Sequence, residues 1–285
     1  MLKGEIWPTL VSIDERTFEQ LERLYRTFGS KQSDYHDIIT ADLPRTFPTH
    51  PKFNENGRRQ LYRVLNAYSI YDNEVGYCQG MNFIVATLLV QMPEETAFAC
   101  FVCFMFRYNL RSLYNDHFEG LTRNLFFIEK LIKSGSDKMR RHLTMCHIEP
   151  GMYAHQWLLS WFCCRFPLTF STRVIDLLAL DRNKSNTVLV RLTVCLMLAY
   201  KHDVLACDID KFMSYFRYVL PMRFSPTNCE QTDTESPELS VHLKEFLNFY
   251  DKYRLTSFRL AQLESEWKAT KTKIKLPNAF TGTLG

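Results

Sequence analysis

Glycine is scarce in this chain, and the glycines that are present form no phosphate-binding loop. Only 10 of the 285 residues are glycine, and no glycine-rich motif resembles those that cradle nucleotide phosphates. The chain therefore shows no nucleotide pocket of its own by the usual motifs. No stretch alternates cleanly between apolar and polar residues, so the sequence does not indicate β-strands.

Long hydrophobic runs and a targeting segment are also missing. The longest apolar run, Met81 to Met92, is too short to span a bilayer, and Pro93 with two glutamates separates it from the next run. The first eight residues lack the hydrophobic core of a signal peptide. We expect a cytoplasmic protein that contacts membranes at most peripherally, through recruitment to endomembranes.

Neither sign of charge dominates the chain. The formal net charge is only +4, which argues weakly for a negatively charged partner and does not indicate nucleic-acid binding. The nine cysteines are an odd number, scattered mostly inside apolar stretches, as in a reduced cytosolic protein without a disulfide framework. Cys100 and Cys103 have metal-ligand spacing, but no second pair accompanies them, so we predict core positions and no metal site.

Aromatic residues and helical periodicity are abundant. Aromatic side chains make up 14% of the sequence, and apolar residues recur at helical spacing, as at Leu61, Leu65 and Tyr68. The pattern predicts an all-α protein without a sheet. Further helices are expected over 121–132, 153–165, 172–180, 186–200 and 208–220.

The C-terminal part differs in composition from the rest. Residues 226–237 are polar and acidic with no large apolar residue, which is typical of a linker. We therefore divide the chain into a helical domain over 1–225, this linker, and a segment over 238–285 that contains a helix over about 239–267 and a basic tail. The tail begins at Lys268 and is expected to be flexible, either as a solubilising segment or in contact with anionic membrane.

Two polar side chains stand on predicted loops beside apolar helices. Arg45 follows a short helix over about 35–43, and Pro44 and Pro48 stiffen its loop, with Pro44 disfavouring helical geometry at Leu43. Gln79 follows turn-forming residues and precedes the apolar helix that starts near Met81. Taken singly, each is most simply a surface residue. Together, a guanidinium and a carboxamide on loops can stabilise charge and orient water at a bound phosphate.

Three neighbours are candidates for supporting roles. Asp42 can orient the Arg45 guanidinium or cap backbone amides. Tyr77 can anchor the glutamine loop by packing its ring. Asn82 can support the site as a hydrogen-bond donor or cap the helix that starts there.

These motifs resemble those of the TBC domain, the all-helical fold of Rab GTPase-activating proteins. The family pattern Ile-x-x-Asp-x-x-Arg is matched by Ile39, Asp42 and Arg45, and the pattern Tyr-x-Gln is matched by Tyr77 and Gln79. The surrounding Arg-Thr-Phe-Pro and Gly-Tyr-Cys-Gln-Gly-Met-Asn also match, and the similarity covers roughly residues 2 to 222. Two long motifs in the right order make the resemblance specific.

The resemblance implies a GTPase activator for a Rab-type small GTPase, acting in vesicle trafficking. Arg45 would neutralise charge on the transferring phosphoryl group, and Gln79 would position the attacking water. Such a protein needs no cofactor of its own, because the partner brings GTP and Mg²⁺, and it is not a self-contained enzyme.

Two alternatives stay open at this point. A catalytically silent TBC-fold module could bind a Rab or a scaffold, an idea motivated by the short segment before Gly4 and Trp7. An unrelated helical hydrolase could use the cysteines to bind a metal. The sequence names neither the GTPase nor the organelle, and it does not give the oligomeric state.

Overall fold

The computed structural model describes residues 2–181, 183, 185–226 and 240–274. Within these ranges the chain is all-α, with no β-strand, so the predicted fold class is confirmed. The elements are, in chain order, α1 (Leu2–Leu10), α2 (Glu15–Gly29), α3 (His36–Asp42), η1 (Pro51–Phe53), α4 (Glu55–Tyr71), α5 (Met81–Gln91), α6 (Glu94–Arg107), η2 (Arg111–Leu113), η3 (Asp116–Phe118), α7 (Glu119–Gly135), α8 (Asp137–Met145), α9 (Pro150–Leu159), α10 (Leu168–Leu180), α11 (Thr187–Ala199), α12 (Lys201–Leu205), α13 (Ile209–Ser214), η4 (Tyr215–Val219), α14 (Leu220–Met222), α15 (Val241–Lys252) and α16 (Ser257–Ile274). No helix in the described part of the chain is long and apolar enough to cross a membrane.

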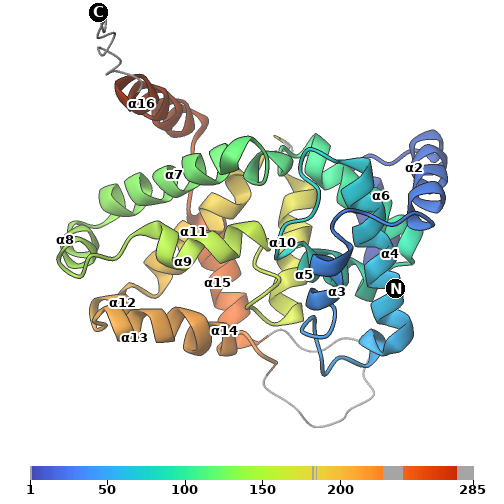
Figure 1. The fold of residues 1–285 in the computed structure, drawn as a ribbon. Coiled ribbons are helices and arrows are strands. Elements are labelled where there is room, and N and C mark those ends of the chain that lie inside the picture. The colour runs from blue at the N-terminus through green and yellow to red at the C-terminus, as the bar shows by residue number, and fades with distance from the viewer. Residues whose placement is uncertain (1, 182, 184, 227–239, 275–285) are drawn as a thin grey trace, which may run out of the picture.

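The helices form two groups around a common core. Helices α2, α4, α5 and α6 pack on one another, and α7 packs on α8, α9 and α11. Figure 1 shows α2, α4 and α6 toward one end of the molecule and α7, α8, α12 and α13 toward the other, with α5 and α10 between them. Helix α5 suits this central place because eight of its eleven residues are buried, most of them apolar.

Contacts between α1 and α10 tie the N-terminal segment to the middle of the chain. Trp7 is buried, and its indole Nε1 donates a hydrogen bond to Asp176 Oδ1 at 2.8 Å. Gly4 lies against the backbone of Gln91, where a Cβ atom would collide with the carbonyl oxygen. The first helix is therefore fixed by close packing as well as by a polar contact.

Stacked aromatic rings bring the C-terminal helix α15 into the core. The rings of Phe166 and Phe170 lie 4.4 Å apart between centroids, and Phe170 lies 5.7 Å from Phe246 on α15. Phe224 contacts both Phe170 and Phe246. Such pairs contribute about 0.5–1.5 kcal/mol each beyond the burial of their area.

The helix predicted over 153–165 extends beyond the end of the observed helix. Helix α9 stops at Leu159, and Trp161 and Phe162 adopt positive φ angles of 46° and 65° although neither is glycine. The Tyr114 hydroxyl donates to the Leu159 carbonyl at 2.8 Å, so this carbonyl has a partner outside the helix. The segment after α9 is therefore a compact turn that ends before Pro167.

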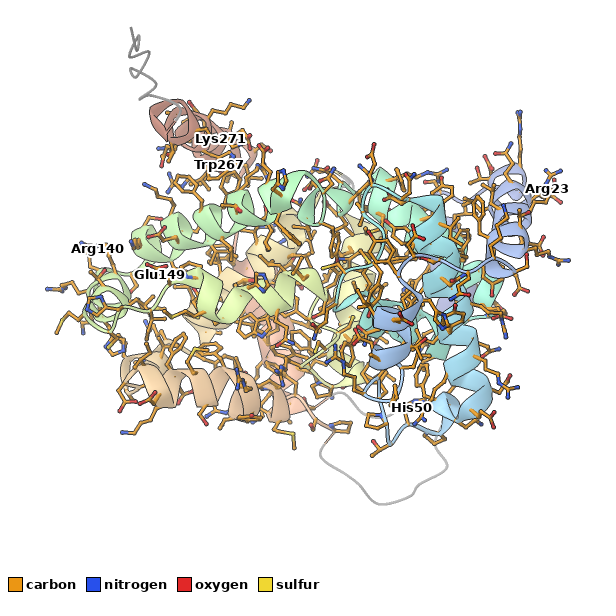
Figure 2. The ribbon with its side chains drawn as sticks, viewed as in Figure 1. Arg23, His50, Arg140, Glu149, Trp267 and Lys271 are labelled. Atoms are coloured by element: carbon orange, nitrogen blue, oxygen red, sulfur yellow. The ribbon has the colours of Figure 1, made fainter. Side chains whose placement is uncertain are left out.

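The C-terminal region is more ordered than predicted. A single helix over about 239–267 was expected, but α15 and α16 are separated at 253–256, and α16 continues to Ile274. Trp267 packs on Phe126 of α7 at 5.5 Å between ring centroids, and Lys271 pairs with Glu119. Figure 2 labels Trp267 and Lys271 on α16. Lys268 and Lys271 thus lie in a helix docked on α7, not in a flexible tail. The rest of the predicted tail from residue 275 and the predicted linker beyond residue 226 lie outside the described residues.

Candidate functional site

The Arg45 loop is a tight turn that follows α3. Pro44 was expected to disfavour helical geometry at Leu43, yet Leu43 has φ −59° and ψ −46°. The turn compensates through hydrogen bonds, because the Thr46 amide donates to the Leu43 carbonyl at 3.2 Å and the Thr46 hydroxyl donates to the Asp42 carbonyl at 2.8 Å. Arg45 projects from this turn with 51% of its side chain exposed.

Asp42 lies beneath the arginine. It is 2% exposed, and its carboxylate pairs with the Arg45 guanidinium through Oδ1 and accepts a hydrogen bond from the Tyr77 hydroxyl at Oδ2. Of the two roles left open for Asp42, the contact with Arg45 is the one the structure contains. A carboxylate fixed in this way limits the orientations of the guanidinium.

Tyr77 does more than pack its ring, because its hydroxyl joins the two loops. The ring is 7% exposed. Burial, and secondarily the hydrogen bond to Asp42, raise the pKa of Tyr77 well above its usual value. The phenol therefore remains a protonated donor to Asp42 at any physiological pH.

Asn82 makes a second link between the loops, and it does not cap α5. The N-cap residue is Gly80, with φ 114°. The Asn82 side chain accepts from the Gly80 amide at 3.1 Å and donates to the Thr46 hydroxyl at 2.7 Å. Since Thr46 and Asn82 are both fully buried, this chain of hydrogen bonds fixes the relative position of the two loops.

Gln79 stands between two glycines that need unusual backbone angles. Gly76 has φ 62°, and Gly80 approaches the end of α9, where a Cβ atom would lie 3.2 Å from the Leu159 carbonyl oxygen. Gln79 itself is exposed. No hydrogen bond within the described part of the chain involves its carboxamide, which leaves that group available to a bound water.

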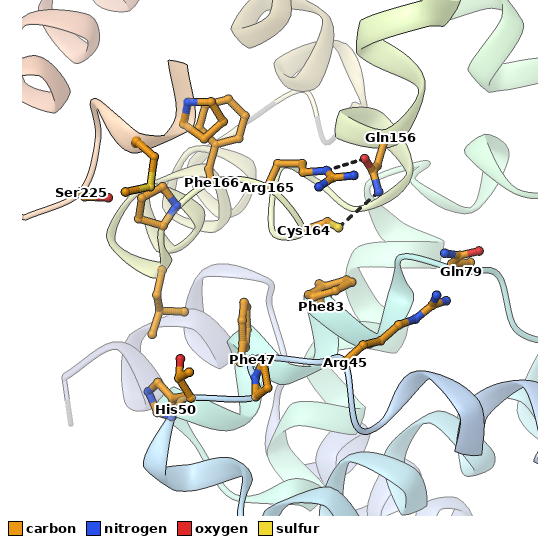
Figure 3. A pocket seen from close by; sticks show the side chains of 16 residues that line it. Arg45, Phe47, His50, Gln79, Phe83, Gln156, Cys164, Arg165, Phe166 and Ser225 are labelled. Carbon is orange, nitrogen blue, oxygen red and sulfur yellow. Dashed lines mark hydrogen bonds between the residues drawn. The ribbon is translucent and has the colours of Figure 1, made fainter. Parts of the chain in front are cut away.

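Arg45 and Gln79 line the same open cleft, which has a volume of about 670 Å³. The sequence placed them on separate loops, and the fold brings them together on one wall (Figure 3). Asp42, Tyr77 and Asn82 lie behind this wall as its support. The rest of the lining is largely apolar and includes Phe47, Phe83, Phe166 and Pro167.

The opposite wall carries polar residues that sequence reasoning missed. Arg165 Nε donates to Gln156 Oε1 at 2.8 Å, and Gln156 Nε2 contacts Cys164 Sγ at 3.3 Å (Figure 3). The sequence did contain a signal, since Arg165-Phe166-Pro167 resembles Arg45-Thr46-Phe47-Pro48 with one residue fewer. Thr46, inside the motif, was likewise not assigned a role.

The charged side chains that line the cleft are cationic. Arg45 and Arg165 are both in the lining, and no aspartate or glutamate is among the described lining residues. Burial, together with the nearby Lys52, lowers the pKa of His50, another lining residue, which favours its neutral form. Burial raises the pKa of Cys78, next to Gln79, to about 11, so that thiol is protonated at neutral pH. Such a surface favours a negatively charged group on a partner.

The cysteine pair with metal-ligand spacing lies in the core. Cys100 and Cys103 are buried on α6, and burial raises the pKa of Cys100 above its usual value. Among the residues that the structure describes, no cluster of three or more His, Cys, Asp or Glu side chains has a geometry suited to a metal ion.

Comparison with known proteins identifies the family. The family model of the Rab-GTPase-TBC domain matches residues 1–205. The chain is 33% identical to the Rab GTPase-activating protein tbc-11 of Caenorhabditis elegans over 275 residues, which is 95% of this chain and 28% of that protein. It is 30% identical to the human ecotropic viral integration site 5 protein homolog, over 94% of this chain and 31% of that protein. The chain thus spans about a third or less of the length of these relatives.

Two solved structures share the fold. The Chlamydomonas flagellar RabGAP TBC domain aligns with a TM-score of 0.63 at 23% identity, over 76% of this chain and 73% of that one. The Ypt/Rab-GAP domain of Gyp1p aligns with a TM-score of 0.64 at 15% identity, over 88% of each chain. With a family model that matches well over half of its length, this chain belongs to the RabGAP-TBC family.

Proposed function

We propose that this protein accelerates GTP hydrolysis by a Rab-type small GTPase and supplies Arg45 and Gln79 in trans. The observation that carries the proposal is the shared cleft, in which both side chains project from one wall and no described lining residue is a carboxylate. Family membership supports the class of partner.

In this mechanism the arginine and the glutamine have separate tasks. The Arg45 guanidinium neutralises charge that develops on the γ-phosphate, and in a related GTPase system an arginine supplied in trans is worth about 10³–10⁵ in rate. The Gln79 carboxamide orients the attacking water. The buried links through Asp42, Tyr77, Thr46 and Asn82 keep both groups close to their working geometry, which reduces the entropy lost on docking.

The protein then needs no cofactor of its own, since the GTPase brings GTP and Mg²⁺. The bond that breaks belongs to the partner's nucleotide, so the protein is an activator that completes another protein's active site. Its setting would be vesicle trafficking, with a cytoplasmic protein recruited peripherally to endomembranes.

The test is single-turnover GTP hydrolysis across a panel of purified Rab GTPases. Wild type, Arg45→Ala and Gln79→Ala are compared, with Arg23→Ala as a matched control because that arginine is 73% exposed on α2, outside the cleft (Figure 2). We expect the wild type and the control to accelerate one or a few Rabs. Arg45→Ala should lower the rate by about 10³-fold or more, and Gln79→Ala should also abolish most of the acceleration.

Two results would count against the proposal. Full acceleration by Arg45→Ala would remove the arginine from the mechanism. Binding of a GTP-loaded Rab without acceleration by the wild type would identify a catalytically silent module instead.

A further inference from the structure

Among the described residues Arg165 has no carboxylate partner, unlike most partly buried arginines of this chain. It is half-buried in the cleft wall, and its only hydrogen bond within the described part of the chain is to the neutral Gln156 amide. Comparable arginines elsewhere form ion pairs of 2.8–3.0 Å, namely Arg63–Glu94, Arg111–Asp72, Arg173–Asp176 and Arg223–Asp203. A partly desolvated guanidinium without a counter-charge is costly unless a partner supplies one.

Gln156 holds this guanidinium in a fixed orientation. Its Oε1 accepts from Arg165 Nε, while its Nε2 is directed to Cys164 Sγ. One of the five N–H donors of Arg165 is therefore used, and those on the two Nη atoms remain for a ligand. A planar fork of this kind matches a carboxylate.

We infer that Arg165, oriented by Gln156, binds an acidic side chain on the surface of the partner GTPase and so acts as a docking residue. This inference rests on the proposed function. It assigns different tasks to the two walls of the cleft, with chemistry on the wall of Arg45 and Gln79 and recognition on the wall of Arg165.

The surroundings favour a protein carboxylate over the nucleotide. Arg45 and Gln79 project from the opposite wall (Figure 3), and Arg45 is already held by Asp42 for work on the phosphate. Arg165 is followed by the lining residues Phe166, Pro167 and Leu168. A cation beside apolar side chains complements a protein surface that presents an acidic residue among apolar ones.

The test separates docking from chemistry through kcat and KM. It uses the Rab that the wild type accelerates most, in multiple-turnover assays over a range of GTP-loaded Rab concentrations. Arg165→Ala is expected to raise KM about 10- to 100-fold, the equivalent of a lost charge-assisted hydrogen bond, with kcat within about twofold of wild type. Arg165→Lys should give an intermediate KM, because it keeps the charge and loses the fork.

A near-isosteric variant tests the same idea without deleting the arginine. Gln156→Glu places a carboxylate against Arg165 Nε. This carboxylate should supply the counter-charge of the guanidinium within the protein itself, so KM should rise although Arg165 is still present. Arg23→Ala is the control for loss of an arginine outside the cleft, and thermal unfolding of each variant checks that the fold is intact.

A charge reversal identifies the partner group. Acidic residues on the switch surface of the same Rab are replaced one at a time by lysine and assayed with Arg165→Glu. Recovery of a low KM for one combination, and not for that Rab variant with wild-type protein, would establish the pair.

The remaining outcomes are decisive as well. A lower kcat with unchanged KM would place Arg165 at the nucleotide and overturn the docking assignment, and unchanged values of both would overturn it too. If the wild type accelerates no Rab, the proposed function fails. The docking assignment is then tested separately, by binding to Rabs loaded with a non-hydrolysable GTP analogue. Weaker binding by Arg165→Ala would support docking, and equal or absent binding would overturn it.

Discussion

Arg45 and Gln79 are exposed, whereas the residues that hold their loops are buried. Asp42, Thr46 and Asn82 are between 0% and 2% exposed, while half of the Arg45 side chain is open to solvent. A long side chain on a fixed turn can reach a partner while its base stays in place. The precision of the site therefore depends on side chains that are closed to solvent.

Tyr77→Phe should damage the site through this support. The change removes the hydroxyl that donates to the buried Asp42 carboxylate, and hydrogen bonds to charged groups are worth about 1.5–3 kcal/mol. We expect the free energy of unfolding to fall by about that amount. The rate of stimulated GTP hydrolysis should also fall, because Asp42 would hold Arg45 less firmly.

Tyr218→Phe is the matched control, since Tyr218 is 57% exposed and should change neither quantity measurably. Denaturant unfolding and single-turnover hydrolysis are measured on both variants. An unchanged stability for Tyr77→Phe would mean that the contact with Asp42 contributes nothing net to the fold.

At the scale of helices and loops, most boundaries were readable from the sequence. Helix α5 was predicted to start near Met81 and does, and the helix before the Arg45 loop ends where expected. These segments carry strong local signals, namely a long apolar run and a proline-bracketed turn. The turn chemistry around Gln79 was likewise visible in Asp72, Asn73 and Gly76.

Two of the predictions that were wrong concern segments whose structure depends on distant contacts. No residue near Leu159 indicates the end of α9, and the carbonyl of Leu159 accepts a hydrogen bond from Tyr114, which is remote in sequence. Because the predicted helix extended to residue 165, it included Arg165, and the place of Arg165 in the cleft was not predicted. The order of the basic segment depends similarly on α7, which supplies Glu119 and Phe126. Local patterns do not contain such information.

Gly76→Ala tests the connection between α4 and α5. The residue has φ 62°, and an added Cβ atom would overlap the ring of Tyr35, which precedes α3. Both the backbone strain and the displacement of the Tyr35 ring oppose the change, so we expect a loss of about 1–3 kcal/mol in the free energy of unfolding. Stimulated hydrolysis should fall too, because the displaced ring adjoins the helix that carries Asp42.

Gly151→Ala is the control for this substitution. Gly151 lies in α9 with no atom near its would-be Cβ, so alanine should leave stability unchanged or raise it by about 0.5–1 kcal/mol. Equal stabilities of the two variants in denaturant unfolding would refute the argument from Gly76 geometry.

At the scale of the whole molecule, many ionisable groups are buried in neutral form. Burial is the main cause that raises the pKa of Cys163, Cys195 and Tyr250 to about 12, and that of Cys78 to about 11. The folded state thus holds these protons more tightly than the unfolded state, in which thiols titrate near 9.0. Stability contributed by protonated thiols is complete below that pH and is lost as pH rises through the folded values.

We therefore expect the free energy of unfolding to decline from about pH 9 toward pH 11, as measured by denaturant unfolding at each pH. Cys78→Ala removes one of the titrating groups and should give a shallower decline. A stability that is constant or rising between pH 9 and 11 would contradict this expectation.

The separation of exposed Arg45 from its buried support has a genetic consequence. A missense change at Arg45, which is half exposed, should leave most of the protein folded and the Arg165 wall intact, whereas a change at the buried Asn82 should lower the cellular abundance of the protein. The first allele would yield a protein that still binds the GTPase but does not accelerate hydrolysis of its GTP. In a heterozygote it would compete with the normal copy, so its inheritance should be dominant where that of the second is recessive.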